Sequence, residues 1–181
     1  NTIFYNYDAM GNLVKETDPV GNIKEYEYDA LNRLISVKLP VGTWHYTYDG
    51  QSNLIKMTDA NGHETVYAYD KKNRLLKETD PLGKSTDYIY DLSGNLIQKN
   101  NPNGNSLSYK YDELNRLIEK SYPGNIDKYA YDEEGNMVSA HNNDIAYTFE
   151  YDNLNRLLKK NIITWNKSLI YTYDAAGNRK T

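Results

Sequence analysis

The sequence predicts an all-β protein made of repeated antiparallel β-hairpins that form a long curved or spiral sheet. Three observations lead to this prediction: a motif that recurs about every 21 residues, aromatic side chains at alternate positions before it, and turn-forming residues after it. Self-similarity at such a period indicates a repeat architecture, in which one supersecondary unit is copied and stacked on its neighbours.

The repeated motif begins with a Tyr-Asp pair. Successive pairs are 20 to 22 residues apart. The pairs are Tyr7-Asp8, Tyr28-Asp29, Tyr48-Asp49, Tyr69-Asp70, Tyr90-Asp91, Tyr111-Asp112, Tyr131-Asp132, Tyr151-Asp152 and Tyr173-Asp174. We therefore expect one hairpin for each pair.

An aromatic residue stands two positions before each motif tyrosine, as Tyr26 does before Tyr28. A spacing of two places both rings on the same face of a β-strand. The chain has 19 Tyr against 2 Phe and 2 Trp, so the rings predict hydroxyl groups that reach water or a partner.

Turn residues follow each aspartate. The segment Asp8-Ala9-Met10-Gly11 is typical: Asp accepts backbone N–H groups across a type I turn, and Gly or Asn in fourth place tolerates a positive φ. Ser52 is the exception to this pattern. A short strand led by Leu or Met comes next, and then a second, looser turn such as Asp18-Pro19-Val20-Gly21, so each repeat predicts two strands.

A second period overlies the first, because the turns alternate in type. Gly-Asn or Ser-Asn turns contain Gly11, Ser52, Gly94, Gly135 and Gly177, whereas Asn-Arg turns contain Arg33, Arg74, Arg116 and Arg156. The true unit is therefore a pair of hairpins. We expect the guanidinium groups to stack on Tyr rings or to pair with turn aspartates of the next hairpin; the alternative is an anion-binding row.

One hairpin cannot be stable alone. Ordering a 20-residue unit costs on the order of 20 to 40 kcal/mol of backbone entropy, whereas a cross-strand aromatic pair returns only about 0.2 to 1 kcal/mol beyond simple packing. Stability must come from lateral stacking of hairpins. A twisted open sheet of more than about ten strands curls, so we expect curvature.

The alternating motifs, for example Tyr90-Asp91-Leu92-Ser93-Gly94-Asn95-Leu96 followed by an Asn-Arg copy at 111–117, closely resemble the YD-repeat or Rhs-repeat family. That family includes bacterial Rhs toxins, the C components of insecticidal toxin complexes, wall-associated proteins and the teneurins. The resemblance covers practically the whole chain. It implies an arc of a YD-repeat β-shell that encapsulates or presents a toxin or effector domain, in a secreted or cell-surface protein that we expect to be bacterial.

Residues 1–181 form one YD-repeat array in this interpretation, and we expect them to be a segment of a larger protein. The expected partners are the remaining repeats and the C-terminal domain of the parent, and the end strands could associate edge to edge. The alternative function is a carbohydrate- or peptide-binding adhesion module that uses exposed tyrosine rows, which makes a glycan the second candidate partner.

Composition gives no support for other partners. The net charge of −4 offers no clustered basic face for nucleic acid, and neither the mean hydropathy of −0.84 nor any apolar run predicts membrane insertion. With no cysteine, disulfides and thiol chemistry are ruled out.

We expect no enzyme, no cofactor and no metal in this segment. Asp18-Pro19-Val20-Gly21 and Asp80-Pro81-Leu82-Gly83 partly resemble the self-cleaving site of toxin-bearing family members, but ordinary turn chemistry explains both. The oxygen-rich turn at 59–64 only faintly suggests calcium. The histidines His45, His63 and His141 lack metal-ligand spacing.

Overall fold

The computed structural model describes residues 2–180, and these residues confirm the all-β prediction. They form seventeen strands and one short 3₁₀ helix, η1 (Ile163–Trp165). The strands are β1 (Phe4–Tyr7), β2 (Leu13–Thr17), β3 (Ile23–Tyr28), β4 (Leu34–Leu39), β5 (Gly42–Tyr48), β6 (Leu54–Thr58), β7 (Glu64–Tyr69), β8 (Leu75–Thr79), β9 (Ser85–Tyr90), β10 (Leu96–Asn100), β11 (Ser106–Tyr111), β12 (Leu117–Tyr122), β13 (Asn125–Tyr131), β14 (Met137–His141), β15 (Ala146–Tyr151), β16 (Leu157–Ile162) and β17 (Lys167–Ile170).

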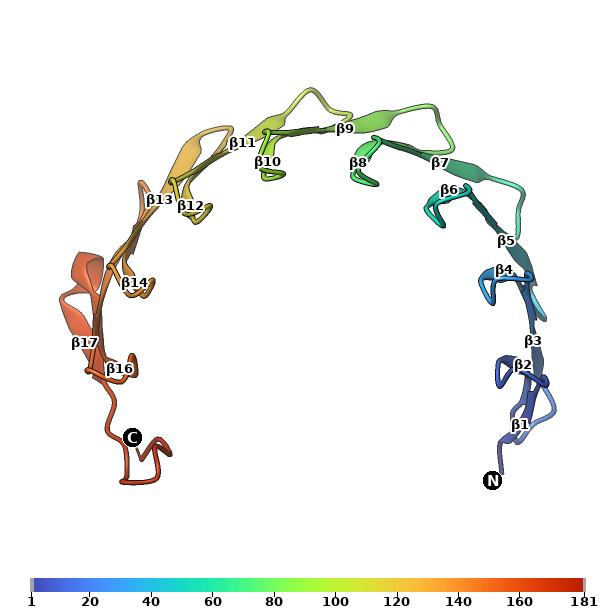
Figure 1. The fold of residues 1–181 in the computed structure, drawn as a ribbon, viewed down its shortest axis with the longest axis horizontal. Helices are drawn as coiled ribbons and strands as arrows, with labels where there is room; N and C mark the ends of the chain where they lie inside the picture. The colour runs from blue at the N-terminus through green and yellow to red at the C-terminus, as the bar shows by residue number, and fades with distance from the viewer. Residues whose placement is uncertain (1, 181) are drawn as a thin grey trace. The chain divides into compact units, whose positions relative to one another are not determined.

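The chain divides into two compact units, residues 1–87 and 88–181, with β9 running from one into the other. In both units each strand pairs antiparallel with its neighbours in the chain, as β3 does with β2 and β4. Within each unit the successive hairpins follow a curve (Figure 1). The predicted array of antiparallel hairpins is therefore confirmed.

The motif turns have one geometry. In the first, the Asp8 carbonyl accepts the Gly11 N–H at 3.1 Å and the Asp8 N–H donates to the Asn12 carbonyl at 2.9 Å. The fourth residue is left-handed, with φ of 88° at Gly11 and 59° at Asn32. Ser52 takes the same conformation, with φ of 69°, although Ser tolerates it less well than Gly or Asn.

The second turns differ from our expectation of a looser geometry. Those beginning at Asp18, Asp59, Asp80 and Asn101 have the same pair of backbone hydrogen bonds as the motif turns. The reason is that they share the chemistry of an Asp or Asn in first place and a Gly in fourth. Two other connections are shorter, with two residues each: Pro40-Val41 and Pro123-Gly124.

Seven of the nine motif tyrosines lie beside a β-bulge. In the β3–β4 pair, Glu27 opposes Ser36 but Tyr28 opposes Leu34, so one extra residue is inserted opposite the end of the Tyr strand. The same shift recurs before Tyr7, Tyr48, Tyr69, Tyr111, Tyr131 and Tyr151. A bulge bends its strand and increases the local twist, so each of these seven hairpins contributes a similar bend.

The sheet has no hydrophobic core among the described residues. No apolar side chain in residues 2–180 is buried, and Ser36, 6% exposed, is the single buried polar residue in this range. The accessible surface is 12,216 Å², whereas a folded monomer of this mass exposes roughly 9,000 Å². The hairpins are therefore held in a single layer, by contacts with their neighbours in the sheet.

Two glycines allow a matched test of the turn geometry. Gly11 has a φ of 88°, and an added Cβ would meet nothing within 4 Å, so Gly11→Ala should cost about 1 to 2 kcal/mol from backbone strain alone. Gly50 lies in an equivalent turn outside the left-handed region and also has open space, so Gly50→Ala should stabilise by about 0.4 to 1 kcal/mol. Urea unfolding of both variants measures the difference. Equal effects would contradict the assigned turn.

Candidate functional site

The candidate site is the row of motif turns along one edge of the hairpins, which sequence analysis singled out. In the Gly-Asn type, the Asp8 carboxylate accepts the N–H groups of Met10 and Asn12 through Oδ1 and the Asn12 side-chain amide through Oδ2, at 2.8 to 2.9 Å. These bonds, led by that of the Asn12 side chain, lower the pKa of Asp8. The carboxylate therefore closes the turn on which it stands.

In the Asn-Arg type, an arginine replaces the asparagine. Asp29 Oδ1 accepts the Leu31 and Arg33 N–H groups, and Oδ2 accepts Arg33 Nε at 2.6 Å. The same ion pair recurs at Arg74–Asp70, Arg116–Asp112 and Arg156–Asp152. We expected stacking on Tyr rings or pairing with aspartates of the next hairpin. The ion pair that forms is with the aspartate of the same turn, because the turn brings the residue four positions later back onto that aspartate.

The guanidinium then reaches the following hairpin through other contacts. Arg33 Nη1 donates to the Asp49 backbone carbonyl at 3.0 Å, and its guanidinium carbon lies 4.8 Å from the centre of the Tyr48 ring. Arg116 makes the same two contacts with Asp132 and Tyr131. The predicted stacking on Tyr rings is confirmed at these positions. The hydrogen bonds to carboxylate and carbonyl oxygens take up N–H donors that an anion-binding row would need.

A different contact joins the hairpins in the other half of the period. Asn12 Nδ2 donates to Asn32 Oδ1 at 3.1 Å, so a Gly-Asn turn is linked to the Asn-Arg turn that follows it. Equivalent bonds join Asn53 to Asn73, Asn95 to Asn115 and Asn136 to Asn155. The asparagine of a Gly-Asn or Ser-Asn turn thus donates to the asparagine of the following Asn-Arg turn, and the arginine of that turn donates to the aspartate carbonyl of the turn after it. This complementarity explains why the sequence repeats by pairs of hairpins.

The motif tyrosines add a third lateral contact. The Tyr28 hydroxyl donates to the Leu13 carbonyl of the preceding hairpin at 3.0 Å. Tyr48, Tyr69, Tyr111, Tyr131, Tyr151 and Tyr173 donate in the same way to Leu34, Leu54, Leu96, Leu117, Met137 and Leu157. Burial raises the pKa of Tyr48. Tyr7, with no described hairpin before it, is 61% exposed.

The structure does not bring together the other residues considered for chemistry. Asp18 and Asp80 close separate turns, between β2 and β3 and between β8 and β9, so they form no carboxylate pair. The carboxylate oxygens of Asp59 are hydrogen-bonded to the Asn61 and His63 N–H groups and to His63 Nδ1. Within residues 2–180 no cluster of His, Cys, Asp or Glu fit to bind a metal ion is found. Nor does this range contain a helix long and apolar enough to cross a bilayer.

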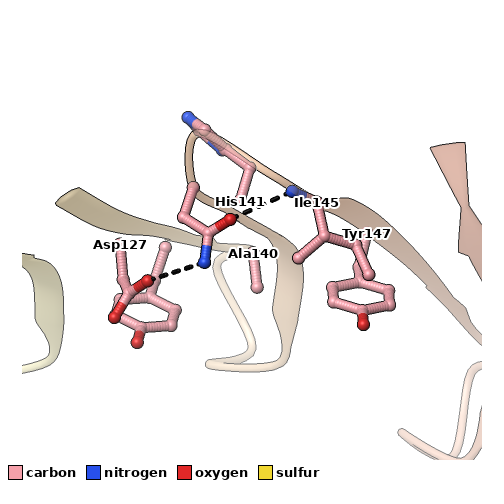
Figure 2. Close-up of a pocket in the computed structure, with 7 residues that line it drawn as sticks. Asp127, Ala140, His141, Ile145 and Tyr147 are labelled. Atoms are coloured by element: carbon pink, nitrogen blue, oxygen red, sulfur yellow. Dashed lines mark hydrogen bonds between the residues drawn. The ribbon is translucent and has the colours of Figure 1, made fainter. Parts of the chain in front are cut away.

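Sequence analysis missed a small cavity on β13, β14 and β15. It has a volume of about 190 Å³ and is lined by Asp127, Tyr129, Ala140, His141, Asn142, Ile145 and Tyr147. Figure 2 shows Ala140 between Asp127 and Tyr147. The Asn142 side chain donates to Asp127 Oδ1 and accepts the Ile145 N–H. The signal was present in the sequence, because Ala140 interrupts a row of larger residues.

Each hairpin has an inner aromatic residue, which is the one two positions before its motif tyrosine. The row consists of the residues that lie eleven positions after these inner aromatic residues. The register places each of these residues directly opposite the inner aromatic ring, as for Tyr26 and Val37 or Tyr46 and Met57. Ala140, opposite Tyr129, is the smallest residue in this row. The members are Glu16, Val37, Met57, Glu78, Lys99, Lys120, Ala140 and Lys160.

Comparisons with known proteins point to one family and one fold. The family model described as Teneurin YD-shell matches residues 1–124 and 89–179. Among solved structures, the Photorhabdus luminescens Tc holotoxin pore with a TccC3 mutation matches with a TM-score of 0.64 and 18% identity over 98% of this chain. TcdB2-TccC3 without its hypervariable C-terminal region matches with a TM-score of 0.63 and 17% identity, also over 98% of this chain.

The matched chains are much longer than this one: the 181 residues span 13% of the first and 15% of the second. At these identities the likeness shows the fold alone. No curated protein sequence matches significantly.

The tyrosine contact gives a direct stability prediction. Tyr131→Phe removes the hydroxyl that bonds the Leu117 carbonyl at 3.0 Å and should cost about 0.5 to 1.5 kcal/mol of unfolding free energy. Tyr109→Phe is the matched control, because within residues 2–180 the Tyr109 hydroxyl makes no such bond. Denaturant unfolding should show a loss at Tyr131 and almost none at Tyr109. Equal losses would mean that the hydroxyl contact contributes nothing specific.

The turn aspartates predict sensitivity to acid. Hydrogen bonds lower the pKa values of Asp8, Asp29, Asp49, Asp70, Asp91, Asp112, Asp152 and Asp174 in the folded chain. Their stabilisation is present above the unfolded pKa of about 3.9 and is lost as the pH falls through the lower folded values. The melting temperature should therefore fall as the pH drops below about 4. A melting temperature that stays constant over this range would contradict the role of the carboxylates.

Proposed function

Because the chain belongs to the teneurin YD-shell family, we propose that it forms part of the wall of a hollow β-shell that encloses or presents another polypeptide. The single observation that carries this proposal is a sheet whose hairpins are joined side by side and which, over residues 2–180, has no hydrophobic core. Such a layer suits a wall, because each hairpin is stabilised by the next and neither face has to be covered by a second layer of the same chain.

The exposed edges of β1 and β17 can pair with further strands. All residues of β1 and β17 are exposed, and β1 pairs with β2 alone among the described residues. Unpaired strand edges are templates for another strand. We propose that the parent's remaining repeats occupy these edges and that a parent C-terminal domain is the presented polypeptide. When the edges are free, the segment self-associates edge to edge.

The proposed role is structural, with no reaction carried out by this segment. Both Asp-Pro-x-Gly segments support this view, because their aspartates close the turns on which they stand. Asp18 accepts the Val20 and Asn22 N–H groups, and Asp80 accepts the Leu82 and Lys84 N–H groups. Long incubation at pH 4 to 8 should leave the mass of the chain unchanged. A discrete product cut at either turn would contradict this role.

A glycan-binding module is the alternative function. Sugars stack on exposed ring faces, but Arg33, Arg116 and Arg156 lie over the rings of Tyr48, Tyr131 and Tyr173. The motif tyrosines therefore support a structural role better than a platform for sugar. A secreted or cell-surface location is part of the shell proposal, by analogy with the toxin-complex structures that share the fold.

Limited proteolysis of the longest gene product that contains this segment tests the proposal. We expect the region beyond the repeats to resist trypsin at neutral pH and to become sensitive when Gly94→Val and Gly135→Val weaken the turns of the wall. Gly50→Ala serves as a control that keeps the wall intact. A gene that encodes these repeats alone, or a C-terminal region that is cut as fast as the isolated domain, would overturn the proposal.

A further inference from the structure

The cavity over Ala140 is a vacancy in a row that lysine fills elsewhere in the same unit. Residues 88–181 contain four members of the row, and three of them are lysines: Lys99, Lys120 and Lys160. The Lys99 ammonium lies 5.4 Å from the centre of the Tyr88 ring, and the Lys160 ammonium lies 4.2 Å from that of Tyr147. At Ala140 the chain supplies only a methyl group.

The geometry of the vacancy fits an alkyl chain between two rings. Ala140 is the cross-strand neighbour of Tyr129 on one side and of Tyr147 on the other, and the register places all three on one face. The two tyrosines thus stand two strand spacings apart, about 9.6 Å. An alkyl chain in contact with a ring on each side needs roughly 7 to 8 Å.

The size of the cavity limits its occupant. A volume of about 190 Å³ is smaller than the roughly 300 to 1,000 Å³ of pockets for drug-sized ligands and cofactors. The cavity is therefore large enough for one side chain or one sugar ring.

The charge at the site decides between these two. Asp127 lies on the same face, two residues before Tyr129, and lines the cavity. Its Oδ1 accepts the Asn142 side-chain amide at 3.0 Å and the Tyr122 hydroxyl at 3.4 Å, whereas its Oδ2 has no hydrogen bond within residues 2–180. A carboxylate oxygen beside two tyrosine rings favours a cation, because ring faces and carboxylates both attract positive charge.

We propose that the slot formed by Asp127, Tyr129, Ala140 and Tyr147 binds a lysine side chain of a partner polypeptide. The butyl chain lies over the Ala140 methyl group between the rings, and the ammonium reaches Asp127 Oδ2. This binding is independent of whether the sheet encloses anything, because the slot is complete within residues 127–147.

Neighbouring cations oppose this binding and set its strength. Lys120 is the cross-strand neighbour of Asp127, although no ion pair joins them within 4 Å in the described chain, and Lys160 lies over Tyr147. Lys128 and His141 alternate to the opposite face, although His141 is also among the residues that line the cavity. We therefore expect dissociation constants on the order of millimolar for a single lysine, and tighter binding in Lys120→Ala.

The test uses the 181-residue chain labelled with ¹³C at alanine methyl groups. Nα-acetyl-lysine methylamide should shift the Ala140 resonance in a saturable way, and Nα-acetyl-norleucine methylamide, which lacks the ammonium, should bind at least about fivefold more weakly. Asp127→Asn should weaken lysine binding up to about fivefold, as expected for a partly exposed ion pair. Added salt should weaken it too.

The most direct test is a variant whose own side chain occupies the slot. Ala140→Lys restores the residue found at three of the four positions and should abolish the response, which is then read from the Tyr129 and Tyr147 ring resonances. Ser139→Lys adds the same charge on the opposite face and should leave binding unchanged. The proposal is overturned if the norleucine probe binds as well as the lysine probe, or if methyl glucoside binds more tightly than either. It is also overturned if Ser139→Lys abolishes binding as fully as Ala140→Lys, or if no probe shifts the Ala140 resonance at a concentration 50-fold above the expected millimolar dissociation constant.

Discussion

The structure depends on contacts between neighbouring hairpins, because no hairpin in the described part of the chain has a core of its own. A single layer that exposes both faces gains less from burial than a compact domain, since its described apolar side chains are at most partly buried. What remains is backbone pairing between strands and the side-chain contacts that join each turn to the next. Stability in such an array is a sum of small nearest-neighbour terms.

These contacts explain the residues that the motif repeats. The aspartate closes the turn, the glycine or asparagine supplies the left-handed residue, and the tyrosine hydroxyl bonds the preceding hairpin. The arginine does two things, since it neutralises its own aspartate and reaches forward to the next tyrosine ring and backbone carbonyl. The double period follows from two alternating contacts. An asparagine amide of one turn bonds an asparagine of the next turn, and the arginine of that next turn bonds a backbone carbonyl of the turn after it.

Much of this arrangement could be predicted from the sequence. The period of the Tyr-Asp pairs gave the hairpins, the alternation of aromatic residues gave the face they share, and Asp with Gly or Asn gave the turns. The ion-pair partner of each arginine could not be predicted, since Asp29 and Asp49 are chemically identical. Only the folded turn shows that Arg33 pairs with the carboxylate of Asp29 and bonds the backbone carbonyl of Asp49. The cavity over Ala140 was also missed, because a small residue has meaning there only once the register shows what stands beside it.

The central claim is that each hairpin is stable because its neighbours are present. The most direct measurement is the unfolding free energy of fragments that contain two, four, six and eight hairpins, cut at the turns between β-strands and followed by circular dichroism in urea. The account predicts unfolded short fragments and a free energy that rises with each added pair of hairpins. A single hairpin, such as residues 22–40, that folds alone, or a free energy that does not change with the number of repeats, would contradict it.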